Sequence, residues 1–323
     1  MAHELTSTDH MFSGNRKKPW HGIGTVVEGL LTADEAIRTA KLDWIVDKVP
    51  MVCFDGKEIK SHVATRRADT GDILGVVGKD WTPVQNFEAF NFFDGVVASR
   101  EAIYESAGSL RGGSRVWLLA KLPEPMVLRN GIQEDVTEKY LLLSNGHDGT
   151  LSLSMMFTPV RVVCSNTLNV ALSTTGSKFK APHRTGIHVR IEEAREVLGM
   201  AIKYYDVLGQ GAQVLTDRQI SSAEFTWYVN TMFPIKENAT QRGITRTENT
   251  RTTVRNLMEA ETQRNIRGTA WGAFNCVTEY ADWARNAQTE DKRLDRVWFG
   301  VNDIKQNAWN LAMNLAENKV QAG

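Results

Sequence analysis

The spacing of hydrophobic residues changes once along this chain of 323 residues. Up to about residue 190, short segments alternate apolar with polar residues between turn-forming residues, which is typical of β-strands. From Ile191 to Leu208, apolar residues recur about every 3.6 positions, which predicts a long helix. We therefore expect an α+β fold with a sheet-rich region over 1–188 and a helical region over 189–323. The length fits one large domain or two ordinary ones.

The first β-rich stretch predicts a β-β-β-α unit. Its segments are three strands and then a helix, over 45–54, 58–67, 73–77 and 87–98. The first two strands are joined by Asp55-Gly56, which tolerates the positive φ angles of a hairpin turn, and Asn86 is the expected N-cap of the helix. Because the connections are short, we expect an antiparallel sheet with this helix packed on it. Further strands are expected over 103–110, 115–122, 140–144 and 151–163.

Two capping boxes mark the starts of further helices, at Thr32-Ala33-Asp34-Glu35 and at Ser221-Ser222-Ala223-Glu224. The polar residues 235–250 predict a mobile loop. Two later helices, over 251–286 and 302–319, carry Trp271, Trp283 and Trp309. These tryptophans are expected to fill a core or a subunit interface.

Charge and cysteine usage limit the classes of function. Lys and Arg total 38, as do Asp and Glu, so a binding site for a polyanion must come from uneven placement of charge. The three cysteines are far apart in sequence, which favours free thiols in a reducing compartment. The first residues lack the apolar segment of a signal peptide, and no apolar run is long enough to cross a membrane. We therefore expect a cytoplasmic protein without membrane contact.

One long stretch of the chain contains no acidic residue. It lies between Asp148 and Glu192, and its cations are Arg161, Lys178, Lys180, Arg184 and Arg190. The middle of the stretch, 173–184, is polar and contains glycine, so we expect an exposed basic loop that neutralises phosphates without reading sequence. The alternative is a solvated loop whose charges contact nothing.

A second candidate for phosphate binding is the turn at 109–115, where two glycines lie between two arginines. Gly112 and Gly113 would let main-chain amides approach a phosphate closely, next to Arg111 and Arg115. No Gly-Lys-Ser/Thr follows, so the motif is not a P-loop. The alternative is a hairpin turn with incidental arginines.

Two weaker basic candidates remain. Arg16-Lys17-Lys18-Pro19-Trp20 would grip a nucleic-acid backbone and stack on a base, or else anchor the chain terminus. Arg264 and Arg267 would face the same groove as the acid-free stretch, or else cap main-chain carbonyls.

No catalytic or metal-binding motif stands out in the sequence. The residues that would suit a cysteine nucleophile with its base, or a metal site, are His147, Asp148, Cys164 and His183. Because His147 and Asp148 lie in a predicted turn and Cys164 ends an apolar strand, we expect no enzyme activity, no metal and no cofactor.

Several sequence blocks resemble a family carried by phages, plasmids and their bacterial hosts, known as domain of unknown function 932 or the phage/plasmid-like protein family. The blocks are Pro19-Trp20-His21-Gly22-Ile23-Gly24, Leu74-Gly75-Val76-Val77-Gly78, Pro83-Val84-Gln85-Asn86, Ala107-Gly108-Ser109-Leu110-Arg111-Gly112-Gly113, Asn145-Gly146-His147-Asp148-Gly149, Thr158-Pro159-Val160-Arg161-Val162-Val163-Cys164-Ser165-Asn166-Thr167-Leu168-Asn169 and Arg267-Gly268-Thr269-Ala270-Trp271. They run from residue 19 to about 285. The resemblance implies a mobile-element context, and hence the cytoplasm of a bacterial host, but no catalytic residues.

The β-β-β-α order is also similar to the core of Rad52-like single-strand annealing proteins, which hold single-stranded DNA in the basic groove of a ring. This similarity implies a non-catalytic homo-oligomer that binds single-stranded DNA and promotes strand annealing in phage recombination. The residues expected at the DNA are Arg111, Gly112, Gly113, Arg115, Arg161, Lys178, Lys180 and Arg184. One alternative is an anti-host factor that binds a bacterial protein through 235–250 and the Trp-bearing helices. Another is a metal-dependent nuclease that uses His147 and Asp148.

Overall fold

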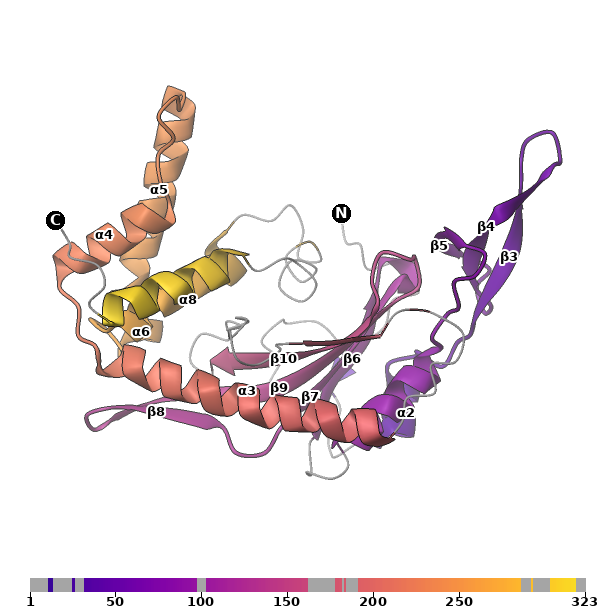
Figure 1. The fold of residues 1–323 in the computed structure, drawn as a ribbon, viewed down its shortest axis with the longest axis horizontal. Helices are drawn as coiled ribbons and strands as arrows, with labels where there is room; N and C mark the ends of the chain where they lie inside the picture. The colour runs from indigo at the N-terminus through magenta and orange to yellow at the C-terminus, as the bar shows by residue number, and fades with distance from the viewer. Residues whose placement is uncertain are drawn as a thin grey trace.

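The computed structural model of the protein describes residues 11–13, 25–26, 32–97, 103–161, 178–181, 183, 191–285, 292 and 303–317. Over these residues, strands form most of the N-terminal half and helices form the C-terminal half (Figure 1). The α+β class predicted from the change of hydrophobic period is therefore confirmed. Among the described residues, no helix combines the length and the apolar character needed to cross a membrane.

The larger sheet has the strand order β11-β10-β9-β7-β6-β1-β2, and β8 pairs with the first part of β9. Only β1 and β2 pair in parallel among the described strands of this sheet. The strands are β1 (Met11–Ser13), β2 (Thr25–Val26), β6 (Ile103–Leu110), β7 (Arg115–Lys121), β8 (Met126–Asn130), β9 (Gln133–Gly146), β10 (Leu153–Arg161) and β11 (Lys178–Ala181). The prediction of an exposed loop is wrong for 178–181, because these residues pair with β10.

A smaller antiparallel sheet consists of β3 (Val46–Val52), β4 (Glu58–Arg67) and β5 (Ile73–Gly78). Its β3–β4 hairpin projects from the body of the molecule, and Gly56 in its turn has a φ of 82° (Figure 1). At the start of β3, the side-chain amide of Gln85 pairs with the main chain of Val46. It accepts from the Val46 N–H and donates to the Val46 carbonyl, each at 2.9 Å.

Helices α1 (Ala33–Thr39) and α2 (Asn86–Val97) lie beside each other, and α2 packs against the larger sheet at β7 and β9. The predicted β-β-β-α order is present, but the helix covers a different sheet from the one that precedes it. Phe93 of α2 contacts Tyr104 of β6, with ring centroids 5.9 Å apart. The predicted cap is wrong, because Asn86 is already part of α2 and its amide oxygen pairs with Nε2 of His147 instead of accepting from a main-chain N–H of the helix.

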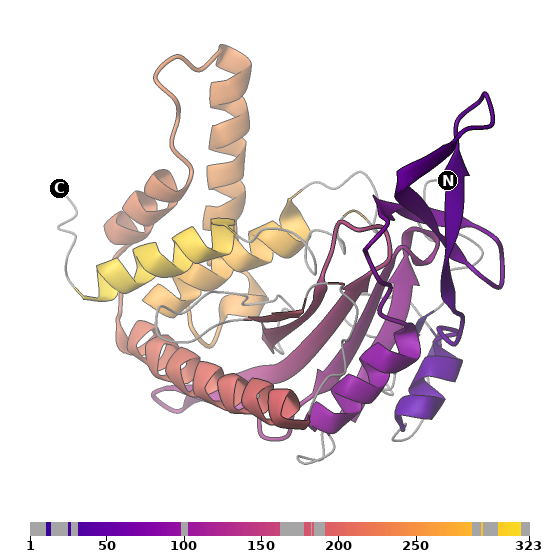
Figure 2. The same ribbon diagram turned by 45° about the vertical axis from the view of Figure 1, so that its right-hand side comes forward.

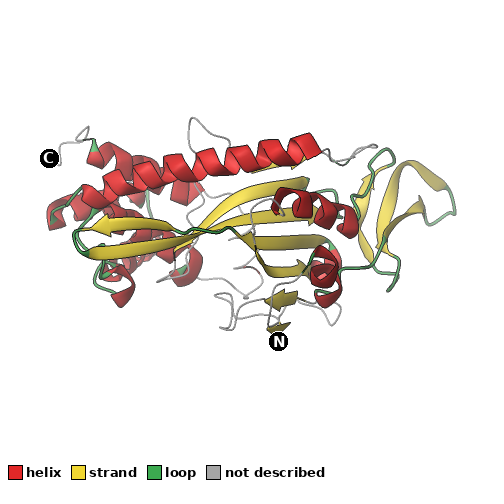
Figure 3. Cartoon of the chain, turned by 90° about the horizontal axis from the view of Figure 1, so that it is seen from below, coloured by secondary structure: helices red, strands yellow, loops and turns green. Residues whose placement is uncertain are grey.

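The long helix α3 (Ile191–Asp217) lies across the larger sheet (Figure 3). Tyr204 and Tyr205 of α3 face Phe157 of β10, with ring centroids 5.4 Å and 6.5 Å from that of Phe157. The same hydrophobic core includes buried residues of α4, α6 and α8, so the helical region packs on the core of the sheet.

The remaining helical elements are α4 (Ser222–Met232), α5 (Gln241–Leu257), η3 (Glu261–Gln263), α6 (Ala270–Glu279), the π-helical turn η4 (Tyr280–Ala284) and α8 (Asp303–Ala316). Trp271 and Trp309 are buried, and the indole N–H of Trp271 donates to Asp135 of β9 at 2.9 Å. The expected mobile loop over 235–250 is wrong from Gln241 onward, because α5 begins there after the N-cap Thr240.

Candidate nucleic-acid interface

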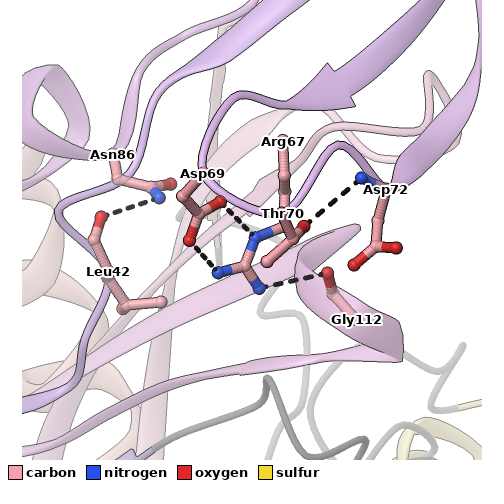
Figure 4. Close-up of polar contacts among 7 residues, drawn as sticks. All are labelled: Leu42, Arg67, Asp69, Thr70, Asp72, Asn86 and Gly112. Carbon is pink, nitrogen blue, oxygen red and sulfur yellow. Dashed lines mark hydrogen bonds and ion pairs between the residues drawn. The ribbon is translucent and has the colours of Figure 1, made fainter.

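The Arg111–Gly113 turn joins β6 to β7 and packs against Trp44. Gly113 is buried with a φ of 99°, and a Cβ atom there would lie 3.0 Å from the Trp44 ring and 3.2 Å from Cδ of Arg67. The carbonyl of Gly112 accepts from the Arg67 guanidinium at 3.4 Å (Figure 4). The buried indole of Trp44 fills the space that the missing side chain of Gly113 leaves, so packing alone accounts for a glycine at this position.

Arg67 joins the smaller sheet to this turn. Its side chain is 4% exposed and pairs with the Asp69 carboxylate at 2.7 Å (Figure 4). The guanidinium carbon lies 4.4 Å from the centroid of the Trp44 ring. The hydrogen bond from Arg67 lowers the pKa of Asp69 below its ordinary value. This arginine is saturated by protein groups, so its role is structural.

His147 packs edge-on against the Trp44 ring, with ring centroids 5.4 Å apart, and is fully buried. Because the amide nitrogen of Asn86 already donates to Leu42, the amide oxygen accepts from Nε2 of His147 at 2.9 Å, and Nε2 carries the proton. Burial is the main cause that lowers the pKa of His147 to about 3, and the charge of the nearby His183 contributes to the same shift. A neutral, buried imidazole offers no accessible base, so the geometry gives no support to a nuclease built on His147.

The sheet register divides the cations predicted to bind DNA. Arg115 pairs with Gly146, and on the far side of β9 Ser154 pairs with both Ser144 and Lys180. Arg115 and Lys180 therefore lie near the same end of the sheet, three strand spacings or about 14 Å apart across the strands and two residues or about 7 Å apart along them. Lys178 is two residues further along β11, opposite Met156, and Arg111 is exposed in the adjoining turn.

Arg161 does not belong to this group. It pairs with Thr137, seven residues along β10 from Ser154, so the main chains of the two sites are about 23 Å apart. Arg184 and the Arg16–Trp20 segment lie outside the described residues. Arg267 donates to the carbonyls of Met258 and Glu259, so it caps main-chain groups, as one of the two interpretations of its sequence position predicts.

A second basic site, which the sequence prediction missed, lies along α5. This helix contains four arginines and one acidic residue and stands away from the body of the molecule (Figures 1 and 2). Two of these arginines contact α4 and the residue that follows it. Arg251 donates to the carbonyl of Phe233, the C-cap of α4, at 2.9 Å, and Arg255 donates to the side chain of Asn230 at 2.8 Å. The other two, Arg242 and Arg246, are exposed and form no ion pair within the described part of the chain.

Arg242 and Arg246 open onto a groove of about 960 Å³ between α5 and the π-helical turn. No carboxylate is among the described residues that line it, which are Gln241, Arg242, Thr245, Arg246, Asn249, Thr250, Thr253, Tyr280, Ala284 and Arg285. Its hydroxyl and amide groups can donate hydrogen bonds to phosphate oxygens. We call it the α5 groove.

The wall of the α5 groove opposite α5 is a π-helical turn held by a buried ion pair. Nζ of Lys305 in α8 lies 2.7 Å from the carboxylate of Asp282, and these side chains are 1% and 2% exposed. The turn places Tyr280 beside α5, where its hydroxyl is 3.2 Å from that of Thr250 and its ring meets Phe233 edge-on. Single π-helical turns inside α-helices occur frequently at functional sites.

The fold and the α5 groove define an α+β protein with an exposed cationic surface along α5 and, among the described residues, no cluster of His, Cys, Asp and Glu able to hold a metal. The chain belongs to the family described as Domain of unknown function (DUF932), whose model matches residues 73–298. The match covers more than half of the chain and includes both basic sites. No curated protein and no solved structure matches the chain.

Proposed function

We propose that this protein binds single-stranded DNA in the α5 groove and promotes strand annealing during recombination of a phage or other mobile element. The observation that carries the proposal is the pair of exposed arginines on an acid-free groove. Arg242 and Arg246 are one helical turn apart, about 6 Å along the axis, which suits contacts to successive phosphates of an extended strand.

The aromatic side chain in the groove favours an unpaired strand over a duplex. Tyr280 is partly exposed and supported by Phe233. Bases of a single strand stack on such rings without sequence preference, whereas the bases of a duplex are already stacked. Strand annealing needs no bond-making residue, so the absence of a catalytic motif in the sequence agrees with the proposal.

The test is the salt dependence of binding to a single-stranded oligonucleotide, measured by fluorescence anisotropy. In the Arg242→Ala/Arg246→Ala variant, the slope of log affinity against log salt should become shallower by about 1.4, or about 0.7 for each phosphate that is no longer neutralised. The control is Arg264→Ala, which removes an arginine with a 66% exposed side chain that pairs with Glu261. It should leave the slope unchanged.

A parallel variant, Lys178→Ala/Lys180→Ala/Arg184→Ala, measures whether the cations of β11 and its neighbourhood also contact the strand. An unchanged slope in the α5 variant would show that the α5 groove does not bind the DNA. A change confined to the β11 variant would place the DNA site at the end of the larger sheet. If the unaltered protein fails to bind single strands at low salt, the proposed function is wrong. Annealing itself is tested by the rate at which two complementary oligonucleotides pair, which the α5 variant should no longer accelerate.

The alternative of an anti-host factor retains one observation in its favour. Trp271 and Trp309 are buried and inaccessible to a partner, but α5 offers an exposed surface to a protein as well as to a nucleic acid. A bacterial protein recovered from nuclease-treated lysate by the unaltered chain, but not by Arg242→Ala/Arg246→Ala, would favour this alternative.

A further inference from the structure

The tip of the β3–β4 hairpin presents a hydrophobic side chain to solvent. Phe54 is fully exposed (110%), and the neighbouring Val52 is 64% exposed. The turn is well defined, because the Cys53 amide donates to the carbonyl of Lys57 at 2.7 Å and the Gly56 amide donates to that of Cys53 at 2.9 Å. The backbone that carries Phe54 is therefore already ordered, so binding would cost mainly the rotamer freedom of one side chain, which favours a role as an anchor.

A groove that suits such a ring lies between the end of α4 and α8. Its volume is about 410 Å³, which accommodates one aromatic side chain, and Met232, Pro234 and Leu311 supply its apolar atoms. Asn307, Asn310 and Asn314 also line it, at positions of α8 that share one helix face. Side-chain amides both donate and accept hydrogen bonds, so they can pair with the main chain of an inserted turn. Among the residues that the structure describes, none that lines this groove is charged.

The β3–β4 turn lies at the opposite end of the molecule from α4 and α8, the helices that line the groove (Figures 1 and 2). Phe54 therefore cannot reach the groove of its own chain. We infer that Phe54 of one copy inserts into the α4–α8 groove of a second copy, in a head-to-tail contact. A contact between two different surfaces leaves a free turn and a free groove at the two ends, so it repeats and closes into a ring when the rotation per copy permits.

Charge at the hairpin tip favours a protein groove over a lipid surface as the site where Phe54 binds. Asp55 pairs with Lys57 at 2.8 Å, and Glu58 follows, so the tip has no basic excess. Anionic membranes attract clusters of Lys and Arg.

The experiment measures molar mass by light scattering over a wide range of protein concentration, without nucleic acid. The unaltered chain should assemble above the monomer mass as concentration rises. Phe54→Ala should weaken the association by about 30-fold or more, as expected for an aromatic anchor. Asn310→Trp, which fills the groove from the opposite side of the contact, should have a similar effect. Ile132→Ala, at an equally exposed apolar residue (102%) in another turn, is the matched control and should leave the mass unchanged.

Mixing the two variants gives the decisive result. Phe54→Ala keeps an intact groove and Asn310→Trp keeps an intact turn, so a mixture can form one contact and should stop at a dimer, while each variant alone stays monomeric. A monomeric unaltered chain, an assembly that survives Phe54→Ala, or a mixture that remains monomeric would each overturn the inference. None of these outcomes depends on DNA binding, so they leave the proposed function to its own test.

Discussion

Replacing Gly113 with alanine should destabilise the protein substantially, for reasons that can be separated by a matched variant. The φ of 99° at Gly113 is a backbone conformation that L-residues avoid, which costs about 1–2 kcal/mol. The added Cβ would also lie 3.0 Å from Trp44 and 3.2 Å from Arg67, both buried, and overpacking of this kind costs about 1–3 kcal/mol. The expected loss for Gly113→Ala is therefore about 2–5 kcal/mol in the free energy of unfolding.

Gly56→Ala provides the comparison. Gly56 has a similar φ of 82°, but no atom would lie within 4 Å of a Cβ added there, so this variant should lose only the backbone contribution of about 1–2 kcal/mol. The assay is urea denaturation followed by tryptophan fluorescence. Equal losses in the two variants would refute the packing role of Gly113. If Gly113→Ala kept its stability but bound single-stranded DNA more weakly, the glycine would serve a ligand after all.

Three further results are expected. Burial lowers the pKa of His147 from 6.5 to about 3, so the unfolded chain takes up this proton at a higher pH than the folded chain does. Stability that is present above pH 6.5 should therefore be lost as the pH falls toward 3, by about 1.4 kcal/mol per pH unit. In acid denaturation, the stability of His147→Asn should depend less steeply on pH, whereas substitution of the exposed histidine, His62→Asn, should leave the dependence unchanged. Asn86→Ala leaves the Leu42 carbonyl and Nε2 of His147 without their partner, so thermal denaturation should show that the free energy of unfolding falls by about 2–4 kcal/mol. A decrease smaller than that of a surface substitution would contradict the role assigned to Asn86. Lys305→Met leaves the buried Asp282 carboxylate without its cation and should lower the free energy of unfolding by about 3–5 kcal/mol, whereas Lys305→Met/Asp282→Leu should recover most of this stability. A double variant no more stable than the single one would show that the two side chains do not stabilise the fold as an ion pair.

Elements that depend on local sequence were predictable. The capping boxes at Thr32 and Ser221 both form, with each hydroxyl accepting from the amide of the glutamate three residues later. Helix α3 follows from its apolar period because one side faces the sheet. Such features need only neighbours along the chain and a core to bury one face.

Features that depend on tertiary partners were not predictable. Asn86 has the local sequence of an N-cap, but Leu42 and His147 take both ends of its amide. Helix α5 has no apolar stripe, because Val254 is its single buried residue, so the period that reveals other helices is missing. The α5 groove was therefore missed.

The cations at the larger sheet show a further limit of sequence reasoning. Their residue types and their acid-free surroundings are visible in the sequence, and the register does bring Arg115 and Lys180 to the same end. The same register sends Arg161 to the opposite end of its strand. Proximity along the chain does not specify the end of a strand at which a side chain lies.

The amide of Gln85 at Val46 has a consequence for how copies of this protein can meet. A strand at the margin of a sheet normally offers unpaired N–H and carbonyl groups that recruit further strands and lead to fibrous aggregates. At the start of β3 both groups are already satisfied within the chain. A further strand therefore cannot pair with Val46, so β-augmentation along this margin would have to begin nearer the tip of the hairpin.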